Sequence, residues 1–357
     1  SATPRHARPA HWRGAGPPPP LRLRVLGAPD VERFFHVDYE YGASGPGEAA
    51  PKPTSRVGII YRCNQWCSFC DLSEMDVKLS PETVKAAIDG SRARGSERLI
   101  LTGGEPTLSP HLVEYVRHAR SAGFSEIVLQ TNAVRLSRGE LVRELVDAGL
   151  AAAQVSIHGA DAALSDRLTQ APGTHERTLR GIDNLVAAGV VCLLNHLVFR
   201  DNASGLVAFV ELARARWGHR PDLVVLQFRA PRNEFERPEE ARAHLAPYSA
   251  FVGPLLEARA LARAYGFGTS ALLDPTGVPS LCVLAAHGAD VPAVAREHGA
   301  VHHHAWESSW FTRVEACRAC GASGACQGVR RDYVEMFGAG EFAPLPAGAA
   351  GRADDGA

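Results

Sequence analysis

Three cysteines, Cys63, Cys67 and Cys70, lie in the stretch YRCNQWCSFC (61–70) and form a C-x₃-C-x₂-C pattern. Thiolates at such short spacings are ligands for iron or zinc. A structural zinc site usually closes four ligands from paired C-x₂-C knuckles, whereas this loop supplies three and has no fourth Cys or His nearby. A cubane iron–sulfur cluster held by three thiolates would keep one iron open for another ligand. We therefore expect an iron–sulfur cluster here, with a structural zinc loop as the alternative.

A second group of cysteines lies near the C-terminus. The stretch CRACGASGAC (317–326) contains Cys317, Cys320 and Cys326 in a C-x₂-C-x₅-C pattern, and Cys282 lies upstream in GVPSLC. Together they supply four thiolates, enough to close a second cluster. Four protein ligands leave no iron open, so we expect a role in electron relay, with structural zinc as the competing interpretation. If Cys282 is not a ligand, the fourth position is open or filled by another group, such as a histidine.

Composition and charge favour an ordinary globular protein. The chain has 357 residues, 45% of them apolar and 22% charged, with a formal net charge of −1, so neither nucleic acid nor an anionic membrane is an expected partner. The N-terminal stretch has no apolar core of a signal peptide, and no run approaches the roughly 18 apolar residues of a membrane span. We therefore expect a cytoplasmic protein whose thiols stay reduced, which favours metal or redox chemistry over disulfides.

Six apolar stretches alternate with amphipathic, helix-like segments. They read as continuous apolar runs, which is typical of parallel strands buried on both faces. The pattern predicts an α/β protein with six βα units in a parallel, barrel-like sheet, and helix starts at Ser80-Pro81, at Ser109-Pro110 and in a capping box from Ser137 to Glu140. The expected strands are RVGIIY (56–61), RLILT (98–102), EIVLQT (126–131), AQVSIH (153–158), VVCLLNHLVF (190–199) and LVVLQF (223–228).

The first cysteine loop follows the first of these strands, at the end where α/β barrels place their chemistry. This position and the spacing, with Phe69 before the last cysteine, resemble the radical S-adenosylmethionine (SAM) superfamily. The resemblance implies a partial (β/α)₆ TIM-type barrel and a 4Fe–4S cluster whose open iron is chelated by the amino and carboxyl groups of SAM. It also implies reductive cleavage of SAM to a 5′-deoxyadenosyl radical, which removes a hydrogen atom from the substrate.

The second strand ends in LTGGEPTL, which resembles the GGEP motif of this family. There the motif binds the methionine amino group of SAM. Gly103 and Gly104 would let the backbone come close to a ligand, Glu105 is an acceptor at the strand end, and Pro106 stiffens the turn. A simple turn is the alternative for this motif taken alone.

Further candidates for SAM binding lie at the next strand ends. The resemblance implies contacts to SAM from Thr131 and Asn132 in QTNA, to ribose or carboxylate from Ser156, and to the carboxylate from Arg167. Asn195 is a candidate for ribose or adenine. The alternatives are that Ser156 and Asn195 are core polar residues and that Arg167 is a surface charge.

Three other residues are weaker candidates. His158 shares a strand face with Ser156 and is either a proton-transfer group or, as we favour, a structural histidine. Gln227 and Arg229, at the end of the sixth strand, are candidates for substrate contacts. No residue is assigned a catalytic role from the sequence.

The C-terminal cysteines and the following QGVRRDYVEMFGAGEF resemble the auxiliary-cluster extensions called SPASM and twitch. The cysteines are too few for a full SPASM extension, so one twitch-like 4Fe–4S cluster is expected. The predicted organisation is a partly disordered Pro/Gly-rich arm (1–55) with one short strand (21–27), the radical SAM partial barrel (56–270), the auxiliary-cluster domain (271–345) and a disordered tail (346–357).

The resemblance is specific for the cofactor and leaves the substrate open. One interpretation is modification of a ribosomally made peptide, and another is oxidation or rearrangement of a small natural-product precursor such as an aminosugar or cyclitol. Either would need a reductant such as flavodoxin or ferredoxin. An iron–sulfur electron carrier or scaffold is the non-enzymatic alternative, although a carrier would not need the GGEP turn.

Overall fold

The computed structural model describes residues 52–70, 79–229, 244–270, 279–299 and 311–351. The predicted strand at 21–27 and most of the predicted N-terminal arm lie outside these residues. Seven parallel strands form one sheet in which every strand pairs with its neighbour in sequence, from β1 to β7. The strands are β1 (Thr54–Ile60), β2 (Arg98–Gly103), β3 (Glu126–Thr131), β4 (Ala152–Ser156), β5 (Val191–Leu197), β6 (Val224–Arg229) and β7 (Gly268–Thr269).

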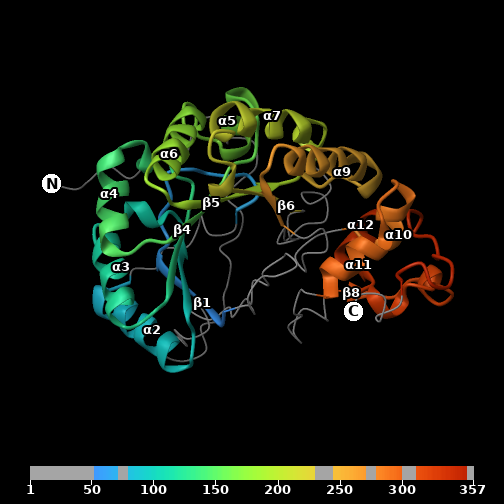
Figure 1. Ribbon diagram of the computed structural model, residues 1–357, viewed down its shortest axis with the longest axis horizontal. Coiled ribbons are helices and arrows are strands. Elements are labelled where there is room, and N and C mark those ends of the chain that lie inside the picture. The colour runs from blue at the N-terminus through green and yellow to red at the C-terminus, as the bar shows by residue number, and fades with distance from the viewer. Residues whose placement is uncertain (1–51, 71–78, 230–243, 271–278, 300–310, 352–357) are drawn as a thin grey trace, which may run out of the picture. The chain divides into compact units, whose positions relative to one another are not determined.

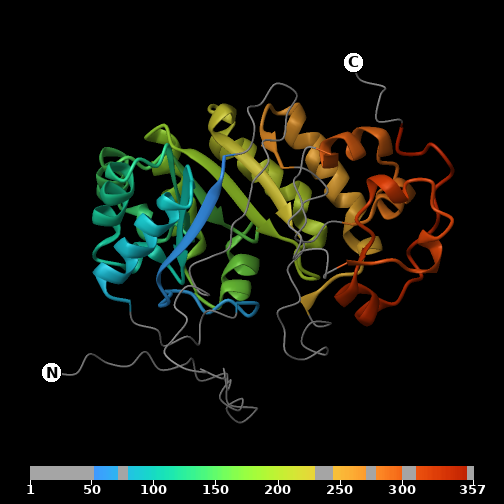
Figure 2. The ribbon, with the colours of Figure 1, turned by 90° about the horizontal axis from the view of Figure 1, so that it is seen from below.

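The six predicted strands are all present, and the short β7 adds a seventh. Helices follow the strands along the chain and lie along the outer side of the curved sheet, as Figure 1 shows for those between β1 and β6. Figure 2 shows the strands running side by side. The sheet does not close within the described residues, so the predicted partial barrel is confirmed. The helices are α2 (Pro81–Ala93), α3 (Leu112–Ser121), α4 (Gly139–Ala148), α5 (Ala162–Thr169), α6 (His175–Ala187), α7 (Leu206–Trp217) and α9 (Tyr248–Ala264).

The apolar core lies between the outer face of the sheet and these helices. Leu99 and Leu101 of β2 are fully buried, as are Leu129 of β3 and Leu145 of α4. Each such side chain contributes roughly 1.5–3 kcal/mol to folding when it leaves water. This core holds the parallel strand ends, and therefore the loops that follow them, in a fixed order.

The inner face of the sheet is more polar than the sequence predicted. Gln130 of β3 accepts hydrogen bonds from Arg56 of β1 at 2.7 Å and from Thr102 of β2 at 2.9 Å. Gln154 of β4 donates to Gln227 of β6 across β5, at 3.4 Å. The expectation of strands that are apolar on both faces is therefore wrong for this side, where amides bond to one another across the sheet.

The predicted helix starts are correct in part. Ser80 caps α2 by accepting a hydrogen bond from the Thr83 N–H, as predicted. Helix α3 begins only at Leu112, after a short turn (Pro106–Leu108). The capping box at Ser137 is wrong, because the Ser137 hydroxyl donates to the Val134 carbonyl.

The C-terminal part contains short elements only. They are α10 (Leu281–Ala286), α11 (Val291–Gly299), β8 (Phe311–Thr312), β9 (Val329–Arg330) and α12 (Arg331–Phe337), with β8 and β9 paired antiparallel. Residues 346–351, which were predicted to belong to a disordered tail, form turns here, and 352–357 lie outside the described residues. Among the helices that the structure describes, none is both long and apolar enough to span a membrane.

Candidate metal and cofactor site

The loop with Cys63, Cys67 and Cys70 follows β1, at the end of the sheet where the other strands also end. Its backbone is tied to the end of α5, because the Trp66 N–H donates to the Thr169 carbonyl at 2.9 Å and the Ser68 N–H to that of Leu168 at 3.2 Å. None of the three thiols is in a disulfide, and all three are partly buried. The fold therefore fixes the path of the loop and keeps its sulfurs available as ligands.

The three sulfurs lie close enough to influence one another. Burial raises the pKa of Cys63 to about 11, and Cys70 contributes in the same direction. Burial also raises the pKa of Cys67 well above its usual range, with further contributions from Cys70 and Cys63. Three thiolates held this close, in partly buried surroundings, are unfavourable without a cation. A bound metal reverses this preference, because a coordinating thiol is deprotonated.

The GGEP turn packs directly on the backbone that leads into the cysteine loop. The Gly104 N–H donates to the Ile60 carbonyl at 2.7 Å, and the Glu105 N–H to the Arg62 carbonyl at 2.8 Å. A Cβ at residue 103 would lie 2.0 Å from the Ile60 oxygen, and one at residue 104 would lie 2.4 Å from the Arg62 oxygen. These glycines therefore allow two protein segments to meet, rather than only a ligand as the sequence suggested.

Glu105 is buried, and both of its carboxylate oxygens accept hydrogen bonds. Oε1 accepts from the Thr107 N–H at 3.0 Å and from the Thr131 hydroxyl at 2.7 Å, and Oε2 accepts from the Asn132 N–H at 2.7 Å. Burial raises its pKa, although these hydrogen bonds oppose the shift. The side chain joins the ends of β2 and β3, with Pro106 buried beside it.

Asn132 connects this joint to the cysteine loop. Its side-chain amide donates to Asn64 Oδ1 at 2.7 Å and lies 3.8 Å from Cys63 Sγ. The Gln65 N–H lies 3.4 Å from the same sulfur. Hydrogen bonds to ligand sulfurs tune iron–sulfur clusters. Asn64 and Gln65 were not predicted as site residues, and only their position between two cysteines could have indicated them.

Phe69 forms an aromatic group with two residues beyond β4 and β5. Its ring lies 4.4 Å from that of Phe199 and 5.0 Å, edge-on, from that of His158. The Nδ1 of His158 accepts the Leu197 N–H at 3.1 Å, and burial lowers its pKa to about 3. His158 is therefore neutral near pH 7, as expected of the structural histidine that the sequence favoured.

The remaining candidates lie farther along the same strand ends. Ser156, partly exposed, pairs in register with Asn195, which in turn pairs with Gln227. Asn195 is 7% exposed, and its Oδ1 is buried with no hydrogen-bond partner among the described residues. An unpartnered buried acceptor is costly and fits a site that a ligand completes. Arg167 is exposed and lies 3.4 Å from Asp201, so the structure supports the surface-charge alternative for this residue.

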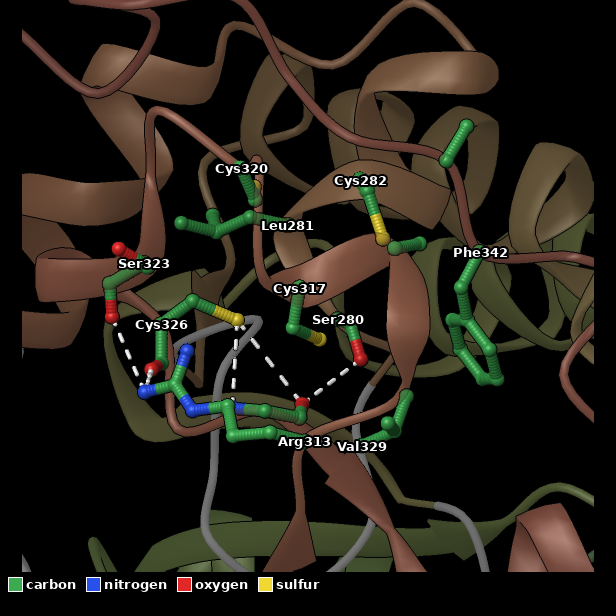
Figure 3. Close-up of a pocket in the computed structure, with 13 residues that line it drawn as sticks. Ser280, Leu281, Cys282, Arg313, Cys317, Cys320, Ser323, Cys326, Val329 and Phe342 are labelled. Carbon is green, nitrogen blue, oxygen red and sulfur yellow. Dashed lines mark hydrogen bonds between the residues drawn. The ribbon is translucent and has the colours of Figure 1, made fainter.

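The four C-terminal cysteines line one pocket (Figure 3), which is partly open to solvent. Cys282 comes from α10, whereas Cys317, Cys320 and Cys326 come from the turns between β8 and β9. Burial raises the pKa of Cys282 to about 11, and the other three cysteines contribute in the same direction. The structure thus brings together the four residues that the sequence grouped.

The backbone around this pocket is closely fitted. The Gly328 N–H donates to Cys326 Sγ at 3.4 Å, and the Gly328 carbonyl accepts from Ser280 Oγ at 2.8 Å. Arg313 donates to the Cys326 carbonyl at 2.7 Å (Figure 3).

Over the described parts of the chain, no three or more His, Cys, Asp or Glu side chains lie close enough together to hold a single metal ion.

Residues 57–213 match the sequence model of the Radical SAM superfamily. Over these residues, which make up less than half of the chain, the protein is similar to that superfamily. A probable GTP 3′,8-cyclase of Sulfolobus acidocaldarius is 30% identical over 44% of this chain and 51% of its own length. A PqqA peptide cyclase of Rhodopseudomonas palustris is 31% identical over 48% of this chain and 46% of its own length. This chain therefore spans about half the length of such relatives.

The fold is also found among solved structures. Native anSMEcpe with bound AdoMet shares it with a TM-score of 0.53 at 15% identity, over 82% of this chain and 93% of that one. The match to this superfamily implies a 4Fe–4S cluster and SAM. The residues present fit both groups, because one loop supplies three mutually close thiols outside any disulfide, and the Asn195 side chain on β5 carries a buried acceptor with no hydrogen-bond partner among the described residues.

Proposed function

We propose that this chain is a radical SAM enzyme in which Cys63, Cys67 and Cys70 hold a 4Fe–4S cluster. SAM then binds at the adjoining strand ends, near the Gly103–Pro106 turn, Thr131, Asn132, Ser156 and Asn195. The observation that carries this proposal is the contact between the two motifs, in which Gly104 and Glu105 donate to the backbone that leads into the cysteine loop. A turn built only to connect two elements would not need this junction.

When bound, the cluster and SAM supply an electron and a 5′-deoxyadenosyl radical that removes a hydrogen atom from the substrate. The chain's own residues would position and shield these groups. Asn195 offers an acceptor that lacks a hydrogen-bond partner in the part of the chain that the structure describes. Phe69, packed on Phe199 and His158, supplies an apolar wall that excludes water from one side of the site.

We further propose that Cys282, Cys317, Cys320 and Cys326 hold a second, auxiliary 4Fe–4S cluster. Its support is the shared pocket that these four thiols line. A cluster with four protein ligands has no iron open to substrate, so electron relay is the role that follows. Metal analysis separates this proposal from structural zinc.

The substrate we favour is a peptide. A relative named PqqA peptide cyclase is 31% identical over 48% of this chain. The structure of anSMEcpe with a bound peptide shares the fold of this chain with a TM-score of 0.53. A small molecule is the second candidate, favoured by the relative named GTP 3′,8-cyclase. Stimulation of SAM cleavage by a peptide or by a small molecule would separate the two.

The proposal is tested by the product of SAM cleavage. Anaerobically reconstituted protein is incubated with dithionite, in place of flavodoxin or ferredoxin, and with SAM, and 5′-deoxyadenosine is measured by mass spectrometry. We expect the unaltered chain to form 5′-deoxyadenosine and the Cys67→Ala variant to form none, because removing one of three thiolates breaks the cluster site. Cys192→Ala is the matched control, since Cys192 is buried within β5 away from both cysteine groups.

Two outcomes would contradict the proposal. Iron-loaded protein that forms no 5′-deoxyadenosine would be an electron carrier or scaffold. If Cys67→Ala formed as much 5′-deoxyadenosine as the unaltered chain, SAM cleavage would not depend on a cluster held by the Cys63–Cys70 loop. Cys320→Ala should retain some cleavage, because its pocket is separate from the loop that binds SAM.

A further inference from the structure

Residues 341–346, which we call the strap, border the pocket of the four C-terminal cysteines. Phe342 and Ala343 line the pocket (Figure 3). The Ala343 backbone lies beside Cys282, near enough to interact with its thiol. The Leu345 N–H donates to Cys320 Sγ at 3.4 Å. One short segment therefore lies against two of the four thiols and donates a hydrogen bond to one of them, although these cysteines lie 38 positions apart in sequence.

The strap is fixed at both ends. At the far end, the Leu345 carbonyl accepts the Gly321 N–H at 2.8 Å. At the near end, Glu341 accepts the hydroxyl of Tyr333 and the Ser249 N–H, the latter at 2.9 Å. Burial alone would raise the pKa of Glu341, but these hydrogen bonds lower it, so the carboxylate is ionised near neutral pH.

Tyr333 connects the strap to the start of α9. Its oxygen accepts the Tyr248 N–H at 2.9 Å, and the two rings stack with centroids 3.9 Å apart and planes 3° from parallel. Phe342 packs edge-on against both rings, at 5.8 and 6.3 Å. The Tyr333–Glu341 hydrogen bond therefore anchors the strap at Glu341. The next two residues, Phe342 and Ala343, line the cysteine pocket.

We propose that the Tyr333–Glu341 hydrogen bond positions the strap and thereby sets the reduction potential of the auxiliary cluster. The inference rests on the proposed function, in which Cys282 and Cys320 are ligands of that cluster. Hydrogen bonds to ligand sulfurs are among the factors that set cluster potentials. N–H groups directed at the thiolates stabilise the extra negative charge of the reduced cluster, so they raise its potential.

The test measures the auxiliary cluster by itself. A parent variant with Cys63, Cys67 and Cys70 replaced by alanine removes the first cluster, and the midpoint potential of the remaining one is measured by EPR-monitored titration. Tyr333→Phe keeps the stacked ring and removes only the hydroxyl. We expect the midpoint potential of the auxiliary cluster to be more negative in Tyr333→Phe than in the parent. A variant that only lost stability would bind less iron, but its remaining clusters would keep the parent potential.

Tyr265→Phe is the matched control. The Tyr265 hydroxyl also donates to a glutamate, Glu211, at 2.7 Å, but on the surface between α7 and α9. Its removal should leave the potential at the parent value. If Tyr333→Phe does not load with iron, Glu341→Gln in the same parent carries the test, because it removes the charge that holds the Tyr333 hydroxyl and the Ser249 N–H.

The outcomes separate this inference from the proposed function. A loaded parent whose potential is unchanged by both Tyr333→Phe and Glu341→Gln would overturn the role of the strap and leave the auxiliary cluster in place. A parent that binds zinc, or no iron, would overturn the auxiliary cluster itself. A shift in Tyr333→Phe without one in Tyr265→Phe is the result we expect.

Discussion

Two buried histidines on neighbouring strands differ in their hydrogen bonding. His158 accepts the Leu197 N–H, whereas neither ring nitrogen of His196 has a partner with normal geometry within the described residues. His196 packs between Phe209 and Phe228. The Ile157 backbone lies near the ring but outside normal hydrogen-bond geometry. A buried imidazole N–H that is paired this poorly is costly, so His196 lowers the stability of the native state.

Replacing His196 with leucine should therefore stabilise the protein. His196→Leu is expected to raise the free energy of unfolding by about 1–3 kcal/mol at neutral pH, measured by urea denaturation of the apo protein. His158→Leu, the control, should lower it, because the Leu197 N–H loses its acceptor. A loss of stability in His196→Leu would show that its ring has a partner after all.

The same substitution should change the pH dependence. Burial lowers the pKa of His196 to about 3, from the 6.5 of an unperturbed histidine. As pH falls below 6.5 the unfolded chain binds a proton that the native state does not, so stability is lost between pH 6.5 and about 3. His196→Leu should flatten this part of the profile, and an unaltered slope would contradict the buried, neutral state.

At the same scale, the sequence identified residue types better than their partners. The sequence correctly predicted Glu105 as an acceptor at a strand end. It did not predict that Thr107, Thr131 and Asn132 donate hydrogen bonds to the carboxylate oxygens of this residue. It could not choose between two roles for Arg167, because only the fold brings Asp201 near it. Contacts between residues far apart in sequence decide both cases.

At the scale of elements, the junction between the GGEP turn and the cysteine loop depends on the absence of side chains. Gly104→Ala would place a Cβ 2.4 Å from the Arg62 carbonyl oxygen, so one backbone segment must move. We expect a loss of about 1–3 kcal/mol in the free energy of unfolding, measured by urea denaturation.

Gly205→Ala is the control for this change, because among the described residues no atom beyond its chain neighbours lies within 4 Å of the Cβ that it would add. Its free energy of unfolding should stay near that of the unaltered chain. Equal effects of the two substitutions would mean that the loss reflects glycine flexibility and not the close approach of the two segments.

The strands could be predicted from sequence because each contains buried apolar residues, such as Ile127, Val128 and Leu129 of β3. The predicted strand EIVLQT coincides with β3. The ends of the other five predicted strands lie within two residues of the observed ends. The start of α3 was misplaced because Ser109 and Pro110 form a turn before the helix. The inner-face amides, such as Gln154 and Gln227, were not expected to bond across the sheet.

At the scale of the whole molecule, the sequence predicted six βα units followed by a cysteine-rich extension, and the fold of the first part is confirmed. The pocket that joins Cys282 to the C-terminal cysteines was indicated only by counting thiols. The strap could not be predicted, because Glu341, Tyr333 and Tyr248 carry no motif and meet only in the folded chain.

The central claim is that the loop of Cys63, Cys67 and Cys70 holds a cluster with one iron open to SAM. The most direct measurement is the EPR spectrum of the dithionite-reduced, anaerobically reconstituted chain before and after SAM is added. We predict that SAM changes the spectrum of the unaltered chain and leaves that of Cys67→Ala as it was. A spectrum of the unaltered chain that SAM does not change, or a sample that contains zinc in place of iron, would contradict the claim.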